Sequence, residues 1–323
     1  MIFSKQIEKM YSKTLFSRHD PDGTVFYFSY TDFPGLKCVP CEFKNQLDNT
    51  LKGAFYSYEG ARDDVIVVFD HGMGAGGHRA YMREIEKLCK EGFCVLSYDH
   101  TGCAASEGEH IRGLSGSLAD LDACISYIKK DGKLKGRELY VVGHSWGAFS
   151  TMNIVSYHPE VKKIVAMSGF ISLKTMHKQL LRGPLALWRR TVFDLESRIN
   201  SDYASANALE SLKNTDAKVL LVYSKDDKTV SEKHHYRALQ KALANRENVE
   251  ILFVDDARGH NPNYTRDAVV YKNEFFRMLT EKKKLRELQT EDEKDSFVKS
   301  FDWYKITEQD EKVWQKIISH LND

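Results

Sequence analysis

The feature that most constrains the fold of this chain is a short turn over residues 143–147, which reads Gly-His-Ser-Trp-Gly. An apolar run over residues 139–142 leads directly into this turn, and residues 148–152 can continue from it as a helix. Glycine at both ends allows a tight connection in which a larger side chain would collide with the neighbouring backbone. The sequence therefore predicts a strand, a sharp turn that carries Ser145, and a helix.

A serine in such a turn is typical of a nucleophile elbow. The strained backbone exposes the hydroxyl of Ser145, and the helix that follows places the backbone N–H of Trp146 where negative charge would develop during acyl transfer. A five-residue pattern is weak evidence by itself. The other loops of the chain must therefore supply the remaining groups that this chemistry needs.

Six short runs of apolar, mostly β-branched residues indicate a parallel sheet, because strands that are apolar on both faces are covered by helices on both sides. These runs are residues 65–69, 94–98, 139–142, 163–167, 218–223 and 249–254. Helical stretches such as 80–91 and 114–130 lie between them. Residues 25–28, 37–43 and 51–58 alternate as expected for antiparallel strands at one edge. Ligand sites in such sheets lie beyond the carboxyl ends of the strands.

Two loops at predicted strand ends carry possible partners for Ser145. A serine hydroxyl needs a base to remove its proton, and the base needs a carboxylate that fixes its tautomer and stabilises its charged form. We predict His260 as the base and Asp227 as the carboxylate, with Asp226 as the rival. The pair Asp255 and Asp256 is less suitable because it lies at the end of the strand that leads to the histidine.

A glycine-rich loop over residues 70–77 follows the first predicted parallel strand. It lacks the lysine and the hydroxyl residue of a P-loop. We expect its Met73 backbone N–H to form an oxyanion hole together with the N–H of Trp146. We interpret His71 as a residue that shapes the loop, because it precedes the nucleophile in the chain. Loop 99–108 is expected to be structural, held by hydrogen bonds between side chains and backbone.

With these loops the chain resembles the α/β-hydrolase superfamily, and within it the serine-aminopeptidase-like or lysophospholipase-like group that includes monoacylglycerol lipases and small bacterial esterases. The resemblance lies in residues 71–74, 99–108, 143–147, 227–230 and 259–260. It favours Asp227 over Asp226, since the family's acid is usually followed three residues later by valine. The sequence departs from the family at residues 103–105, where Cys-Ala-Ala replaces a glycine-containing run.

The resemblance implies an α/β-hydrolase fold, in which a mostly parallel central sheet of about eight strands is flanked by helices and carries a small helical cap. Residues 1–169 and 217–323 would form the core, and residues 170–216 would form the cap that covers the elbow. Within the cap, residues 174–190 contain five basic and no acidic side chains. A solvated face over an apolar underside is the preferred interpretation, with attraction of an anionic substrate or a lipid surface as the alternative.

The part of the chain after His260 is longer than the resemblance predicts, and the role of this insertion, residues 262–305, cannot be inferred. Residues 266–287 are expected to be helical, the highly charged residues 288–300 favour a mobile segment, and residues 308–321 fit a closing helix. The aromatic cluster over residues 301–304 is interpreted as core packing, with a role in a lid as the alternative.

Composition excludes several other classes of protein. The 47 basic and 46 acidic side chains give a net charge of +1, so there is no electrostatic case for a nucleic-acid partner. Residues 1–16 suggest a short amphipathic helix and resemble neither a signal peptide nor a membrane anchor. The six cysteines are expected to be reduced, which favours a cytoplasmic location. Cys38 and Cys41 have the spacing of a metal or redox pair, but no second pair of ligands lies near them.

The expected function is hydrolysis of a small-molecule acyl ester, with lipid-like esters among the candidates, by a serine hydrolase that uses no cofactor and no metal. An amide or peptide hydrolase and an acyltransferase would use the same three residues and remain alternatives. An epoxide or haloalkane hydrolase is disfavoured, since those relatives carry aspartate where Ser145 stands. The natural substrate, the acyl chain length and the oligomeric state are not predicted.

Overall fold

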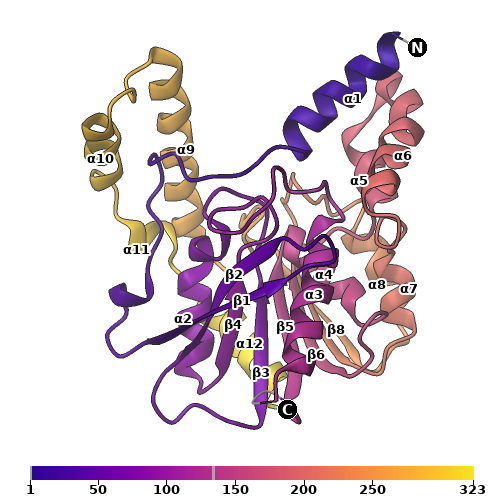
Figure 1. The fold of residues 1–323 in the computed structure, drawn as a ribbon, viewed down its shortest axis with the longest axis vertical. Helices are drawn as coiled ribbons and strands as arrows, with labels where there is room; N and C mark the ends of the chain where they lie inside the picture. The colour runs from indigo at the N-terminus through magenta and orange to yellow at the C-terminus, as the bar shows by residue number, and fades with distance from the viewer. Residues whose placement is uncertain (1, 133–134) are drawn as a thin grey trace.

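A single eight-stranded sheet, with helices on both faces, organises the computed structural model, which describes residues 2–132 and 135–323 (Figure 1). Its order is β1-β2-β4-β3-β5-β6-β7-β8, and all pairs are parallel except β1 with β2 and β2 with β4. The strands are β1 (Lys37–Lys44), β2 (Thr50–Ser57), β3 (Val65–Asp70), β4 (Cys94–Tyr98), β5 (Glu138–His144), β6 (Val161–Met167), β7 (Lys218–Ser224) and β8 (Val249–Val254). The predicted mostly parallel sheet is therefore confirmed.

Alternating side chains of the parallel strands form two cores, one on each face of the sheet. Val141 packs with α3, α4, α7 and α8, whereas its neighbour Val142 packs with α2 and α12 on the other face. The helices are α1 (Ile2–Leu15), α2 (Met82–Lys90), α3 (Gly116–Lys130), α4 (Trp146–Ile154), α5 (Leu173–Leu180), α6 (Arg189–Ile199), α7 (Ala208–Lys213), α8 (Tyr236–Leu243), α9 (Arg266–Leu285), α10 (Glu291–Lys299), α11 (Trp303–Ile306) and α12 (Glu311–Asn322), with short 3-10 turns at Tyr30–Asp32, Gly77–Tyr81 and Gly183–Trp188.

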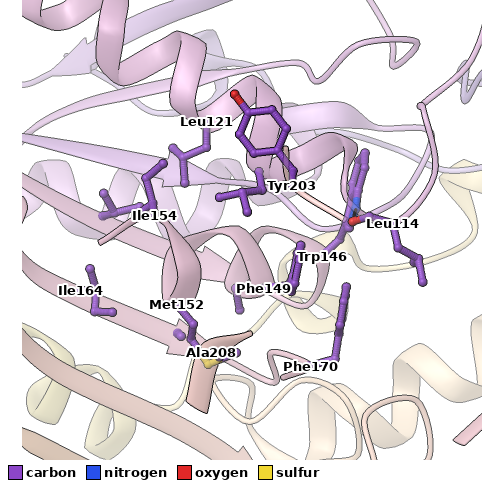
Figure 2. Close-up of a cluster of buried hydrophobic side chains, with 14 of the residues drawn as sticks. Leu114, Leu121, Trp146, Phe149, Met152, Ile154, Ile164, Phe170, Tyr203 and Ala208 are labelled. Carbon is purple, nitrogen blue, oxygen red and sulfur yellow. Dashed lines mark hydrogen bonds between the residues drawn. The ribbon is translucent and has the colours of Figure 1, made fainter. Parts of the chain in front are cut away.

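Helix α4 is buried along its whole length, and its packing fixes the direction of the turn before it (Figure 2). The ring of Phe149 stacks on that of Phe170, with centroids 4.4 Å apart and an interplanar angle of 5°. The indole of Trp146 is also buried, and its Nε1–H donates a hydrogen bond to the carbonyl oxygen of Leu114 at 2.7 Å. A helix held on every side in this way gives its first turn little freedom to move.

A buried ionic cluster joins the elements below this turn. His100 Nε2 lies 3.1 Å from Asp70 Oδ1, and His100 Nδ1 lies 3.4 Å from Asp120 Oδ2. Asp70 also accepts hydrogen bonds from the hydroxyls of Tyr98 and Ser150. Burial alone would lower the pKa of His100, but the two carboxylates raise it to about 9. The cluster therefore connects β3, β4, α3 and α4 through charges that compensate one another.

Two groups of helices stand above the sheet in Figure 1, with α9 and α10 at the upper left and α1, α5 and α6 at the upper right. The first group contains its own aromatic core, in which Phe275 contacts Phe297, Phe301 and Trp303. In the second group, the hydroxyl of Tyr11 donates a hydrogen bond to Glu196 Oε1 at 2.8 Å. No helix in residues 2–132 and 135–323 has the length and apolar character needed to cross a bilayer.

Several expectations about local structure require correction. Residues 25–28 form no strand, because their aromatic side chains pack against other rings, Phe26 against Trp303 and Phe28 against Tyr304. Residues 288–300, expected to be mobile, contain α10, which begins with a capping box formed by Thr290 and Glu293. The helix expected over residues 1–16 is α1, and residue 1 lies outside the described residues.

The candidate metal or redox pair Cys38 and Cys41 is divided between the two faces of β1. Side chains an odd number of positions apart on a strand point in opposite directions. Cys38 packs against the core that contains α2, whereas Cys41 packs against the core that contains α3. The two thiols therefore do not face one ligand, which agrees with the preferred interpretation of structural cysteines.

The charge of His100 should make part of the stability of the protein dependent on pH. Because its pKa rises from about 6.5 in an unfolded chain to about 9 here, this stabilisation is fully present below pH 6.5 and is lost as the pH rises through 9. The free energy of unfolding of the wild type, measured by urea titration relative to His100→Gln, should therefore fall by about 3 kcal/mol across this range. A difference that stays constant with pH would contradict this account.

Candidate active site

The turn at the end of β5 holds Ser145 in a strained backbone conformation. Its φ is 57° and its ψ is −111°, a combination that non-glycine residues rarely adopt. The conformation is maintained because the Ser145 N–H donates a hydrogen bond to the carbonyl oxygen of Met167 on β6, at 2.8 Å. A Cβ at Gly143 would collide with Thr151, and one at Gly147 would collide with the carbonyl oxygen of Asp70. Glycine is therefore required at both positions for α4 to approach β3 and β5.

The structure brings Ser145, His260 and Asp227 together in one hydrogen-bonded chain. His260 Nε2 lies 2.7 Å from Ser145 Oγ, and His260 Nδ1 lies 2.8 Å from Asp227 Oδ2. The carboxylate can only accept, so Nδ1–H donates to it and Nε2 is left to accept the hydroxyl proton of Ser145. The Asp227 side chain is fully buried, and its other oxygen accepts from the backbone N–H groups of Thr229 and Val230. These bonds hold the carboxylate in position toward the ring.

The other three candidate carboxylates do not contact His260. Asp226 Oδ1 accepts from the Gly259 N–H at 2.9 Å, so it supports the loop that carries the histidine. Asp255 pairs with Lys225 at 2.8 Å, and Asp256 pairs with Arg258. Of the four carboxylates considered, Asp227 is the one in contact with the imidazole, in agreement with the order that the sequence and the family resemblance favoured.

Met73 and Trp146 both line the cavity that contains Ser145. Trp146 is the first residue of α4, so its N–H has no acceptor within the helix. Met73 belongs to the glycine-rich loop after β3, which passes close to the elbow because Gly72 leaves room there for the hydroxyl of Tyr81. Both residues therefore lie near the Ser145 hydroxyl.

A second histidine, His144, holds the His260 loop and was missed by the sequence analysis. His144 Nε2–H donates to the carbonyl oxygen of His260 at 2.7 Å, and Nδ1 accepts from the hydroxyl of Tyr81 at 2.9 Å. Burial and the nearby His260 lower the pKa of His144 well below its usual range, so the ring is neutral, as this pattern requires. The residue was visible inside the motif, but nothing in the sequence identified its partners.

The loops interpreted as structural behave as expected. His71 is buried, donates from Nδ1 to the Gly72 carbonyl oxygen, and accepts at Nε2 from the His100 N–H. Asp99 accepts from the backbone and ring of His78 and from the Ala105 N–H. Burial would raise the pKa of Asp99, but His78 and these bonds hold it at about 2. These hydrogen bonds hold both loops in place.

The cavity above Ser145 has a volume of about 600 Å³. Much of its wall is apolar, with side chains contributed by α1, α5 and the loops around them; these include Leu15, Leu114, Phe170, Met176, Leu180 and Val230. Such a wall suits an apolar part of a ligand. Within the described ranges, no cluster of three or more His, Cys, Asp or Glu side chains has the arrangement needed to hold a metal ion.

Comparison with known proteins relates part of this chain to a described family and the fold to several solved structures. A family model described as serine aminopeptidase, S33, matches residues 61–208. No curated protein sequence gives a significant match. Among solved structures, an esterase of Pyrococcus furiosus is similar with a TM-score of 0.59 and 22% identity, over 82% of this chain and 97% of its own.

Two further structures share the fold at lower identity. An esterase domain of a Rhodothermus marinus protein has a TM-score of 0.51 at 16% identity, over 74% of this chain and 96% of its own. An acylaminoacyl peptidase of Pyrococcus horikoshii has a TM-score of 0.51 at 18% identity, over 70% of this chain and 38% of its own. These structures show that the chain shares the α/β-hydrolase fold. Over residues 61–208 it is similar to the serine aminopeptidase branch.

The close approach of α4 to β3 gives a direct test of the elbow. Gly147→Ala would place a methyl group against the carbonyl oxygen of Asp70, so we expect a loss of about 3 kcal/mol in unfolding free energy or failure to fold. Gly74→Ala is the matched control, because nothing lies within 4 Å of its added methyl group. Thermal unfolding should separate the two variants. Equal melting temperatures would show that the elbow tolerates a side chain.

Proposed function

We propose that this chain is a serine hydrolase that cleaves carboxylic esters through an acyl-enzyme. The observation that carries the proposal is the hydrogen-bonded chain from Asp227 through His260 to Ser145, at the floor of a largely apolar cavity. A hydroxyl, an imidazole and a buried carboxylate in this order are the groups that nucleophilic acyl transfer needs.

In the proposed mechanism His260 Nε2 takes the hydroxyl proton of Ser145 as Oγ attacks the carbonyl carbon of the ester. Asp227 holds the ring in the required tautomer and stabilises the imidazolium that forms. The tetrahedral oxyanion is bound by the N–H groups of Met73 and Trp146. When it collapses, the proton on Nε2 passes to the departing alkoxide, which leaves as the alcohol. Water then repeats these steps on the acyl-enzyme and releases the acid.

Preference for an ester over an amide is supported by the cavity. Its wall is apolar over most of its area, which suits an acyl chain. The similarity to the esterase of Pyrococcus furiosus is in accord with this, whereas the acylaminoacyl peptidase of Pyrococcus horikoshii keeps an amide or peptide hydrolase as the second candidate. An acyltransferase would differ only in using another acceptor in place of water.

We also propose that residues 170–216 act as a cap over a core made of residues 1–169 and 217–323. Met176 and Leu180 of α5 line the cavity, so this insertion contributes directly to the wall that a substrate would meet. A cytoplasmic location, independence from metals and cofactors, and the lack of a stable membrane anchor remain predictions from the sequence.

Replacement of the proposed nucleophile tests the mechanism and the cavity together. Ser145→Ala should lower kcat for p-nitrophenyl esters by about 10⁴-fold or more, because nothing else in the site can form the acyl-enzyme. A series of acyl chain lengths on the wild type should show an optimum set by the cavity. Ser201→Ala, which changes an exposed serine outside the site, is the control. A flat response that does not depend on Ser145 would remove the esterase proposal.

The two adjacent aspartates allow the role of the acid to be tested with a matched pair. Asp227→Asn should lower kcat by about 10⁴-fold, because an amide in that position favours the wrong tautomer of His260. Asp226→Asn removes a charge and weakens the hydrogen bonds that Asp226 Oδ1 accepts from the Gly259 N–H and the Ser224 hydroxyl, so it should cost at most about tenfold. Steady-state kinetics on one ester suffice for both variants. A larger loss in Asp226→Asn than in Asp227→Asn would exchange the two roles.

A further inference from the structure

Lys272 places a positive charge in the wall of the cavity beside the site. It lies on α9, is half-buried, and its Nζ donates a hydrogen bond to Asn261 Oδ1 at 3.1 Å. The ammonium also lies 4.7 Å from the centroid of the Tyr264 ring. Among residues 2–132 and 135–323, no carboxylate forms an ion pair with it. An ammonium group that is partly removed from water and contacts no anion lowers the stability of the protein. A ligand that supplies an anion would offset this cost.

The nearest acidic influence on Lys272 comes from Glu84, which forms no ion pair with it and has one of its two oxygens engaged elsewhere. Glu84 Oε1 accepts from Asn263 Nδ2 at 3.1 Å and from Gln309 Nε2 at 3.2 Å. Burial raises the pKa of Glu84, which favours its neutral form. Desolvation lowers the pKa of Lys272 to about 8, with Glu84 opposing the change. The lysine is therefore incompletely compensated by the protein itself.

Lys272 stands where two cavities meet. Met73, Tyr81, Asn261 and Lys272 line both the cavity above Ser145 and a second one of about 310 Å³. The second cavity lies between the glycine-rich loop and the helices after His260, and its wall is rich in aromatic rings, including Tyr27, Phe275 and Trp303. A ligand that spans the two cavities would pass the ammonium group.

The chemistry of the proposed reaction indicates which half of the substrate reaches Lys272. His260 Nε2 must deliver its proton to the leaving oxygen, so the alcohol half lies on the His260 side of Ser145. Lys272 is hydrogen-bonded to Asn261, the residue that directly follows His260. The alcohol half is therefore directed toward Lys272 and the aromatic cavity, which leaves the larger apolar cavity for the acyl half.

We propose that the second cavity binds the alcohol half of the ester and that this half carries a carboxylate, which pairs with Lys272 Nζ. The inference rests on the proposed esterase function. A carboxylate on an aromatic or apolar skeleton fits a site with one ammonium group and several rings. Lys272 is the one cationic side chain among the described residues that line this cavity, which favours a ligand group with a single negative charge.

The test compares two esters that differ only in charge on the alcohol side. These are 4-acetoxybenzoate and its neutral amide analogue, 4-acetoxybenzamide, and the readout is the ratio of their kcat/KM values. Lys272→Met should reduce this ratio by about tenfold relative to the wild type, because it removes a charge-assisted hydrogen bond. Lys272→Arg should keep most of the ratio. Any difference in intrinsic reactivity between the esters cancels when variants are compared.

Lys284→Met is the matched control, since it makes the same change at an exposed position of α9 and should leave the ratio unaltered. An unchanged ratio in Lys272→Met, with Ser145-dependent hydrolysis of both esters, would overturn this inference while the proposed function stands. The assignment of the carboxylate to the alcohol half of the ester has its own test. This test compares monophenyl succinate, whose carboxylate lies on the acyl side, with the corresponding amide. A Lys272-dependent preference for that carboxylate instead would overturn the assignment to the alcohol half.

Binding provides a readout that does not depend on turnover. In Ser145→Ala, calorimetry should show 4-hydroxybenzoate binding about tenfold more tightly than 4-hydroxybenzamide. The difference should disappear in the double variant that also carries Lys272→Met. If neither ester is hydrolysed by the wild type, the esterase proposal fails, and this measurement still decides whether Lys272 recognises the carboxylate. Equal binding of the two ligands would rule that recognition out.

Discussion

The contact on which the rest of the site depends is the approach of the first turn of α4 to the end of β3. Because Gly147 has no side chain, the helix can lie directly against the carbonyl oxygen of Asp70. That approach fixes Ser145 next to the loop that begins at Asp70 and contains Met73. It also brings the Asp70 side chain under the helix, where it binds the hydroxyl of Ser150 and the ring of His100. The absence of a side chain at Gly147 therefore determines both the position of the Ser145 hydroxyl and the position of the Asp70 carboxylate beside His100.

Much of the fold could be predicted, because the six parallel strands are short, apolar runs whose periodicity and flanking loops have few alternatives. The convergence of the loops at the strand ends could also be predicted, since parallel strands bring their carboxyl ends to one edge of the sheet. The convergence of Ser145, Asp227 and His260 follows from this topology, although their catalytic roles remain a proposal. The strand expected at residues 25–28 was wrong, because an alternating aromatic pattern also fits a segment that packs its rings against α11.

The features that could not be predicted depend on contacts between residues far apart in the sequence. Residues 288–300 are highly charged, which favoured mobility, but Phe297 packs on Phe275 and stabilises a helix there. The capping box of Thr290 and Glu293 is a local signal that could have indicated this helix. His144 and Lys272 are separated from their partners by loops whose paths no local pattern determines. Their significance became visible only once the cavity wall and the hydrogen bonds of the His260 loop were known.

The bond from His144 to the carbonyl oxygen of His260 adds a second hydrogen bond between the two segments that Ser145 and His260 already join. Because His144 is the immediate neighbour of Ser145, any displacement of the elbow carries the imidazole with it. The three proposed catalytic residues are therefore already aligned in this structure. A change in α5, which contributes Met176 and Leu180 to the cavity wall, would alter the space offered to a ligand without replacing any of these three side chains.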